Sequence, residues 1–188
     1  FKEATGQKAE IYLEDVDLFS AGIEPLAKSG KLGALLAQFP PSFVNDENGQ
    51  KTIGALIETF GQYPLAIELR HRSWSDDPNT NKILANNNIC WVQIDEPKFN
   101  ISVAKDIPLT SDIAYFRFHG RNKEMWWKGD NETKYKYLYS PDVLSELAKE
   151  VKSTIKKMKS TFVYFNNHWR GYAPQNAIEM TKALAEQI

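Results

Sequence analysis

The sequence has a single cysteine, and it has no long apolar run. Cys90 cannot form an internal disulfide, and one cysteine cannot supply the pattern of a zinc site, so a reducing cytoplasm is the expected compartment. No apolar stretch approaches the roughly 20 residues that a membrane-spanning helix needs, and the amino end shows no charged-then-apolar signal segment. We therefore expect a cytoplasmic protein with no membrane partner.

The sequence also lacks an excess of charge of one sign. It has 23 basic and 24 acidic residues, for a formal net charge of -1. A protein that follows a nucleic acid backbone is usually strongly basic, so nucleic acid is not the favoured partner. The sequence contains no phosphate-binding P-loop, no dinucleotide glycine fingerprint and no serine or cysteine nucleophile elbow, so it has no motif for an organic cofactor.

What the sequence does contain is an alternation of strand and helix patterns over 188 residues, of which 42% are hydrophobic. Such a chain can bury one sizeable core, and no low-complexity linker divides it, so residues 1–188 are expected to form a single α/β domain. The alternation predicts βαβ units and a parallel sheet. Strand patterns occupy about 33–39, 65–70, 90–95, 113–119 and 161–167, and helical patterns about 15–29, 52–62, 79–88, 140–158 and 174–187.

Each predicted strand has one apolar and one polar face. Successive residues of a strand point to opposite sides, so Glu68 and Arg70 share one face, while Leu65, Ile67 and Leu69 share the other. By the same parity, the other strands place on their polar faces Gln38, then Trp91, Gln93 and Asp95, then Tyr115, Arg117 and His119, and then Tyr164 and Asn166. An open, doubly wound sheet would be apolar on both faces, so a closed barrel fits better. Eight-unit barrels typically need about 250 residues, and only five strands are evident, so about three units would be missing.

Five segments in order carry a family resemblance. They are Gln38-Phe39-Pro40-Pro41-Ser42-Phe43, Glu68-Leu69-Arg70-His71-Arg72-Ser73-Trp74, Arg117-Phe118-His119-Gly120-Arg121-Asn122, the helix start at Tyr139-Ser140, and Tyr164-Phe165-Asn166-Asn167 with Ala173-Pro174-Gln175-Asn176-Ala177. Between about Leu26 and Ala177 the chain resembles the domain of unknown function 72 family, also called YecE-like. The resemblance implies a TIM-barrel-like (β/α) fold that normally begins with about three further strands, so the missing units would lie at the amino end. It implies no function, and a fold alone supplies none.

Polar residues at the carboxyl ends of the predicted strands form the candidate site, because ligands bind at that end of a parallel α/β barrel. Arginine grips phosphate or carboxylate bidentately, so we expect an enzyme, a hydrolase or an isomerase, that acts on a small anionic substrate by acid–base or hydrolytic chemistry. His119 would be the general acid or base, with Glu68 or Asp95 tuning its pKa or orienting it. Buried carboxylates need partners, so Glu68 and Asp95 should pair with Arg70 and Arg117 or with the ligand. The predicted substrate-binding residues are Gln38, Arg70, Arg117, Gly120, Arg121, Asn166 and Asn167.

Three alternatives stay open. The same residues could form a salt-bridged polar core, or they could bind a divalent metal for a hydrolase or isomerase through Glu68, Asp95, His119 and His71, although nearby arginines oppose a cation. A non-catalytic module could instead bind a nucleotide or a nucleic acid end, stacking it on aromatic residues of the strand-end loops. These aromatic residues, which could equally cover the loops, are Trp74, Trp126, Trp127, Tyr135, Tyr137, Tyr139, Trp169 and Tyr172. His71 is expected to cap or hydrogen-bond a loop and His168 to lie at the rim; the sequence indicates no oligomeric state.

Overall fold

A computed structural model describes residues 13–185, which divide between Leu35 and Leu36 into two units. The first unit contains helix α1 (Leu13–Lys28), where the pattern predicted a helix over 15–29. Acidic Glu14 and Asp15 lie in its first turn and Lys28 in its last, which suits the helix dipole. Within residues 13–185, no helix is both long enough and apolar enough to cross a bilayer.

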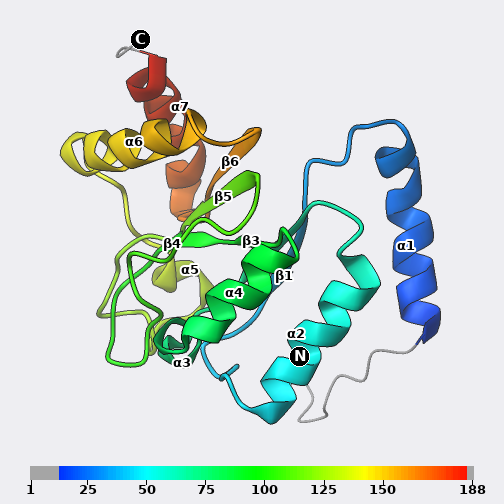
Figure 1. Ribbon diagram of the computed structural model, residues 1–188. Helices are drawn as coiled ribbons and strands as arrows, with labels where there is room; N and C mark the ends of the chain where they lie inside the picture. The colour runs from blue at the N-terminus through cyan, green and yellow to red at the C-terminus, as the bar shows by residue number, and fades with distance from the viewer. Residues whose placement is uncertain (1–12, 186–188) are drawn as a thin grey trace. The chain divides into compact units, whose positions relative to one another are not determined.

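The second unit alternates strands with helices, as the sequence predicts (Figure 1). Its strands are β1 (Leu35–Gln38, which begins at the last residue of the first unit), β2 (Leu65–Glu68), β3 (Cys90–Trp91), β4 (Gln93–Asp95), β5 (Ile113–Phe118) and β6 (Ser160–Phe165). Its helices are α2 (Glu47–Phe60), α3 (Arg72–Asp76), α4 (Pro78–Asn86), α5 (Asn131–Lys134), α6 (Pro141–Ile155), the 3-10 helix η1 (Trp169–Gly171) and α7 (Tyr172–Ala185). The predicted helix over 174–187 ends among residues that lie outside the described range.

The strands form two three-stranded sheets, in the orders β1-β2-β3 and β4-β5-β6. The pairs β2–β3, β4–β5 and β5–β6 are parallel. The strand predicted over 90–95 is interrupted at Val92, whose backbone N–H donates to Ile67 O. The mixed α/β fold with parallel sheets is confirmed. The described strands form no closed barrel, so the barrel-like arrangement stays a prediction.

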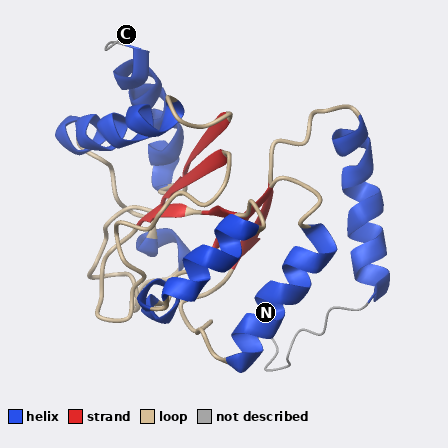
Figure 2. Cartoon of the chain, viewed as in Figure 1, coloured by secondary structure: helices blue, strands red, loops and turns tan. Residues whose placement is uncertain are grey.

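Helices α6 and α7 pack against one face of β5 (Figure 2). Phe116 and Phe118 of β5 are buried there with Leu144, Leu147 and Val151 of α6. The apolar spacing along α6 directs these side chains to one stripe, and Ser140 caps the first turn as its sequence predicts. We call this side of β4, β5 and β6 the helix face, and the opposite side, which carries Arg117 and His119, the inner face.

The connections after β4 and β5 contain little regular structure. Residues 96–112 form no helix, whereas helices follow β1, β2 and β5 in the described chain. This connection is fastened to the end of β2 by the backbone hydrogen bonds Val103 N–H to Arg70 O and Arg72 N–H to Ile101 O, both 2.7 Å. The two long connections thus lie at the carboxyl ends of the strands, where the sequence places the candidate site.

Candidate functional site

A buried cluster of charged side chains centres on Glu68, at the end of β2. Its side chain has no exposed surface, and its Oε1 accepts hydrogen bonds from Arg70 Nε at 2.6 Å and Nη2 at 2.5 Å. Its Oε2 accepts from Arg117 Nη1 at 2.5 Å, and Arg117 Nη1 also donates to Gln38 Oε1. The parity argument therefore brings Gln38, Glu68, Arg70 and Arg117 together as predicted, and Glu68 pairs with both arginines.

His119 lies in the same cluster and is 1% exposed. Its Nε2 is 3.0 Å from Arg70 Nη2 and 3.3 Å from Glu68 Oε1. A guanidinium only donates hydrogen bonds, so we assign Nε2 as the acceptor in the contact with Arg70, which places the proton of the neutral ring on Nδ1. That Nδ1 atom has no hydrogen-bond partner in the structure. His119 thus presents a buried N–H group with nothing to donate to.

The pKa values in the cluster are strongly displaced. Burial would raise the pKa of Glu68, but His119 and the charges of Arg70 and Arg117 lower it to about 2. Burial lowers the pKa of His119 to about 4, aided by the two arginines and opposed by Glu68. At neutral pH the cluster therefore holds an ionised carboxylate, a neutral imidazole and two guanidinium ions.

A second carboxyl group, Glu96, faces the same cluster. Its Oε2 lies 3.5 Å from Arg70 Nη1, and the side chain is 3% exposed. Burial raises the pKa of Glu96, against the lowering effect of Arg70 and Lys98. This carboxyl group keeps its proton to a higher pH than an exposed glutamate does, so the cluster carries a net positive charge whenever Glu96 is protonated.

Glu96, His119 and Asn166 occupy one row on the inner face. The strand register pairs Asp95 with Phe118 and Phe118 with Phe165, so the residue after each of these belongs to the next row. Each residue of that row has one buried polar atom that makes no hydrogen bond: Glu96 Oε2, His119 Nδ1 and Asn166 Oδ1. Buried polar atoms are normally satisfied, and three together at the carboxyl ends of three adjacent strands need an explanation.

The prediction that Trp91, Gln93 and Asp95 share the face of Glu68 is wrong. Gln93 and Asp95 are paired with Phe116 and Phe118 of the helix face, and Trp91 is paired with Ile67, on the side opposite Glu68. The strand was predicted with the wrong parity because its polar residues were assumed to face the inner side. The inner carboxyl group of this strand is Glu96, which the sequence analysis missed; alternation from Ala66, whose partner is Cys90, identifies it.

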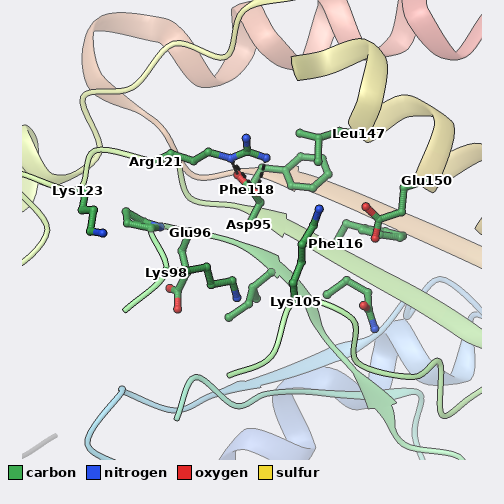
Figure 3. A pocket seen from close by; sticks show the side chains of 13 residues that line it. Asp95, Glu96, Lys98, Lys105, Phe116, Phe118, Arg121, Lys123, Leu147 and Glu150 are labelled. Carbon is green, nitrogen blue, oxygen red and sulfur yellow. Dashed lines mark hydrogen bonds and ion pairs between the residues drawn. The ribbon is translucent and has the colours of Figure 1, made fainter. Parts of the chain in front are cut away.

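Asp95 instead organises the helix face (Figure 3). Its carboxylate accepts hydrogen bonds from Arg121 Nε and Nη2 at 2.7–3.0 Å and from the Tyr139 hydroxyl at 2.7 Å. The same hydroxyl accepts from the Gly120 N–H at 2.8 Å. Arg121 and Gly120 were both predicted to bind substrate. Instead, the Arg121 guanidinium donates to Asp95, and the Gly120 N–H donates to Tyr139. Because burial and Asp95 raise the pKa of Tyr139, this hydroxyl keeps its proton.

Asn167, also predicted to bind substrate, lies between the sheet and α7. Its Nδ2 donates to Tyr137 O and to Asn176 Oδ1, both at 2.8 Å, and Asn176 in turn bonds the backbone of Tyr139. The side chain has no exposed surface. Asn167 therefore ties the end of β6 to α7, and its neighbour Asn166 is the one on the inner face.

The other two histidines lie apart from His119. His71 caps α3, where its Nδ1 accepts from the Ser73 N–H at 3.2 Å, as expected of a loop-capping residue. His168 is exposed. The four predicted metal ligands are not brought together, since Asp95 lies on the helix face and His71 at the cap. Within residues 13–185, no three histidine, cysteine or carboxylate side chains form a metal-binding group.

One aromatic side chain of the strand-end loops, Tyr135, lies next to His119. The Tyr135 ring centroid lies 6.3 Å from that of His119, 4.9 Å from that of His168 and 6.1 Å from that of Trp126. Trp126 is buried, so it fixes Tyr135 from behind, whereas Trp127 is 55% exposed. Some of the predicted aromatic residues thus cover the loops, and others stay accessible.

Comparisons with known proteins agree on one family. The family described as "Protein of unknown function DUF72" matches residues 1–188, and the chain belongs to this family. The UPF0759 protein YunF of Bacillus subtilis is 30% identical over 181 residues, which are 91% of this chain and 64% of that protein. The chain thus spans less than two thirds of that relative's length.

Solved structures of DUF72 family proteins have the same fold. The crystal structure of one from Thermotoga maritima is 40% identical with a TM-score of 0.86, and the match covers 92% of this chain and 65% of that one. The crystal structure of one from Enterococcus faecalis is 30% identical with a TM-score of 0.85, covering 97% and 70%. These names give no substrate and no reaction.

Proposed function

We propose that this member of the DUF72 family binds a small anionic substrate, phosphorylated or carboxylated, on the inner face at the carboxyl ends of the strands, and acts on it by acid–base chemistry. The observation that carries the proposal is the row of three buried atoms on Glu96, His119 and Asn166 that make no hydrogen bond, of which Glu96 Oε2 has only an ion pair with Arg70 at 3.5 Å. A salt-bridged polar core would satisfy its own polar groups, because an unsatisfied buried group costs about 1–3 kcal/mol. A substrate with donor and acceptor oxygens would satisfy all three.

Charge supports an anion at this place. Arg70 and Arg117 carry two positive charges against the single charge of Glu68, and Glu96 adds a negative charge only when it loses its proton. An anionic group beside Arg70 would balance the cluster and would share the guanidinium that now reaches Glu96 only at 3.5 Å.

The roles of the side chains follow from their protonation states. A neutral His119 offers its Nδ1–H to a carbonyl or phosphoryl oxygen, and so stabilises negative charge that develops there. Glu96, with its raised pKa, carries the proton that is transferred. Glu68 stays ionised and holds the two guanidinium groups in place. This assignment moves the proton-transfer role from His119, where the sequence analysis placed it, to Glu96.

Binding and turnover in the full chain test the two parts of the proposal separately. Orthophosphate and succinate are titrated calorimetrically; His119→Phe, which keeps the ring but removes the N–H, should weaken binding about tenfold. Asp112→Asn, at the opposite end of β5, should leave affinity unchanged. In a turnover screen with sugar phosphates and other phosphomonoesters, Glu96→Gln should abolish activity and keep orthophosphate binding. Equal affinity of His119→Phe and the parent protein would refute the anion site, and an active Glu96→Gln would refute its catalytic role.

A second candidate is a non-catalytic module that binds a nucleotide, and the position of Tyr135 favours it. Its ring lies beside His119 and next to the exposed His168, where it could stack a base. Such a module would bind a nucleoside monophosphate about tenfold more tightly than orthophosphate, would lose that preference in Tyr135→Ala, and would turn over none of the phosphomonoesters. No preference for the nucleotide would exclude it.

We also propose that the described strands form an arc of a TIM-barrel-like (β/α) barrel. Parallel pairing supports this, together with a helix layer on one face and polar side chains on the other. In a closed barrel the outer edge of β6 would be paired, so its outward amides would exchange with deuterium as slowly as those bonded to β5. Closure of the barrel would be contradicted if the β6 amides on the outer edge exchanged rapidly while those bonded to β5 exchanged slowly.

A further inference from the structure

A cavity of about 390 Å³ lies on the helix face, against β4, β5 and α6 (Figure 3). We call it the helix-face cavity. Residues 96–112, which join β4 to β5, form no helix, so the helix face of β4 lacks the cover that α6 gives to β5. The cavity is therefore a consequence of this unusual connection, and Arg117, which belongs to the inner-face cluster, lies on the other side of β5.

The charges around the helix-face cavity do not balance. Four cationic residues line it, Lys98, Lys105, Arg121 and Lys123, along with three acidic ones, Asp95, Glu96 and Glu150. Asp95 is engaged by Arg121 and Tyr139, and the Glu96 carboxyl group faces Arg70 on the inner side. Of the three lining carboxyl groups, Glu150 is then the one left to face the lysines, while Asp106, outside the lining, adds a negative charge that acts on Lys98. Burial raises the pKa of Glu150, which weakens even that counter-charge.

One of these lysines is partly withdrawn from water. Burial lowers the pKa of Lys98, although Glu96 and Asp95 raise it, and its Nζ donates to Val103 O at 3.1 Å. A backbone carbonyl oxygen offers only part of the charge that an ammonium group requires. An anion in the cavity would stabilise the charged form of Lys98 and reduce the repulsion among the lysines.

The remaining wall is apolar and aromatic. Phe116 and Phe118 are each 2% exposed, and Leu147 of α6 is 6% exposed. Figure 3 shows the Lys105 side chain pointing into the cavity toward Phe118. These largely buried side chains form the floor of the cavity and present a small apolar area within reach of an amine, a combination that suits a compact charged group attached to a ring.

We propose that the helix-face cavity binds a small organic anion, a carboxylate or a phosphate monoester with a compact apolar or aromatic part that packs on Phe118 and Leu147. The volume lies at the lower end of the range for ligand pockets, which limits the ligand to about the size of a substituted benzene ring. Glu96 borders both sites, with its carboxyl group directed to Arg70, but none of Glu68, Arg70, Arg117 and His119 lines the cavity, so the two sites are distinct.

The test is an NMR titration of the full chain with benzoate and phenyl phosphate, with benzyl alcohol and acetate as matched probes that lack the charge or the ring. Either aromatic anion should produce saturable shifts at the amides of Phe118 and Leu147, and the stronger of the two identifies the anionic group. Lys105→Ala should weaken this binding about tenfold. Lys105 is exposed, so the variant should fold; Lys149→Ala, at an exposed position of α6 outside the cavity, is the control.

Three results would overturn the inference. They are the lack of a saturable shift with both aromatic anions, equal binding of benzyl alcohol or acetate, and unchanged affinity in Lys105→Ala. The His119 signals report the inner-face site in the same spectra, so failure at the helix-face cavity is read independently of the proposed function.

Discussion

The two faces of the sheet hold their charges in different ways. On the inner face, Glu68 lies between two guanidinium groups with no exposed surface, and the side chains of Arg70 and Arg117 are 4% and 11% exposed. On the helix face, the Asp95 and Arg121 side chains are 14% and 35% exposed, and the Asp95 carboxylate accepts hydrogen bonds from Arg121 and Tyr139. The helix-face pair is a self-contained structural link, whereas the inner face combines deep burial with polar atoms that lack partners. Single buried atoms without a hydrogen bond also occur elsewhere, as at Asn167 Oδ1, so the feature that distinguishes the inner face is three such atoms in one row beside buried charges.

The comparison is tested most strongly by removing one carboxylate charge from each face. Glu68→Gln leaves Arg70 and Arg117 buried with no anion between them, and should lower the free energy of unfolding by about 3–5 kcal/mol. Asp95→Asn, its counterpart on the helix face, leaves Arg121 with access to water and should cost about 1–2 kcal/mol. Urea denaturation of the two variants measures both. Equal losses would show that the faces do not differ in this way.

Acid should act mainly on the inner face. His119 and Glu68 both have a lowered pKa in the folded protein, so each contributes stability that is lost as the pH falls. For His119 the loss runs from about 6.5 toward about 4, and for Glu68 from about 4.5 toward about 2. The pKa of Glu96 is raised in the folded protein, so Glu96 contributes stability at low pH that is lost as the pH rises. In urea melts between pH 7.5 and 3, His119→Gln should flatten the slope between pH 6.5 and 4; an unchanged slope would contradict the buried neutral imidazole.

Gly120 lies where the chain passes from His119 on one face to Arg121 on the other. Its φ is +89°, and a Cβ there would lie 2.8 Å from Tyr137 Cβ. Gly120→Ala should therefore cost about 2–3 kcal/mol, through backbone strain and the clash together. Gly171 has φ +84° with nothing near its added Cβ, so Gly171→Ala should pay only the strain, about 1 kcal/mol. Thermal or urea unfolding compares the two variants. Equal losses in the free energy of unfolding would show that the protein relieves the contact with Tyr137 without destabilisation.

Tyr139 gives the smallest expected effect. Tyr139→Phe removes the hydroxyl that joins Asp95 to the Gly120 N–H, and should cost about 1 kcal/mol because Asp95 keeps its bonds from Arg121. Orthophosphate affinity should stay unchanged, since the link lies on the helix face. A large loss of affinity would show that this link positions His119, and the two faces could then not be treated as separate.

The sequence allowed much of this arrangement to be predicted. Alternation along β2 and β5 correctly grouped Glu68, Arg70, Arg117 and His119, because both strands have an unmistakable apolar face. The strand over 90–95 misled the prediction, because both of its faces are largely buried and polarity alone does not tell which side Gln93 and Asp95 take. Asn166 and Asn167 show a similar limit, since two identical neighbouring residues point to opposite faces. The hydrogen bonds that join Asp95 to Arg121 and Tyr139 could not be predicted, because these three residues come from segments far apart in the sequence.

The most direct test of the account observes His119 itself. We predict that titrating orthophosphate into the full chain shifts the His119 ring-nitrogen resonances saturably in NMR spectra, and raises the pKa of His119 above its value of about 4, because a bound anion stabilises the imidazolium ion. His119 resonances and a pKa that do not change at saturating phosphate would contradict an anion site on the inner face.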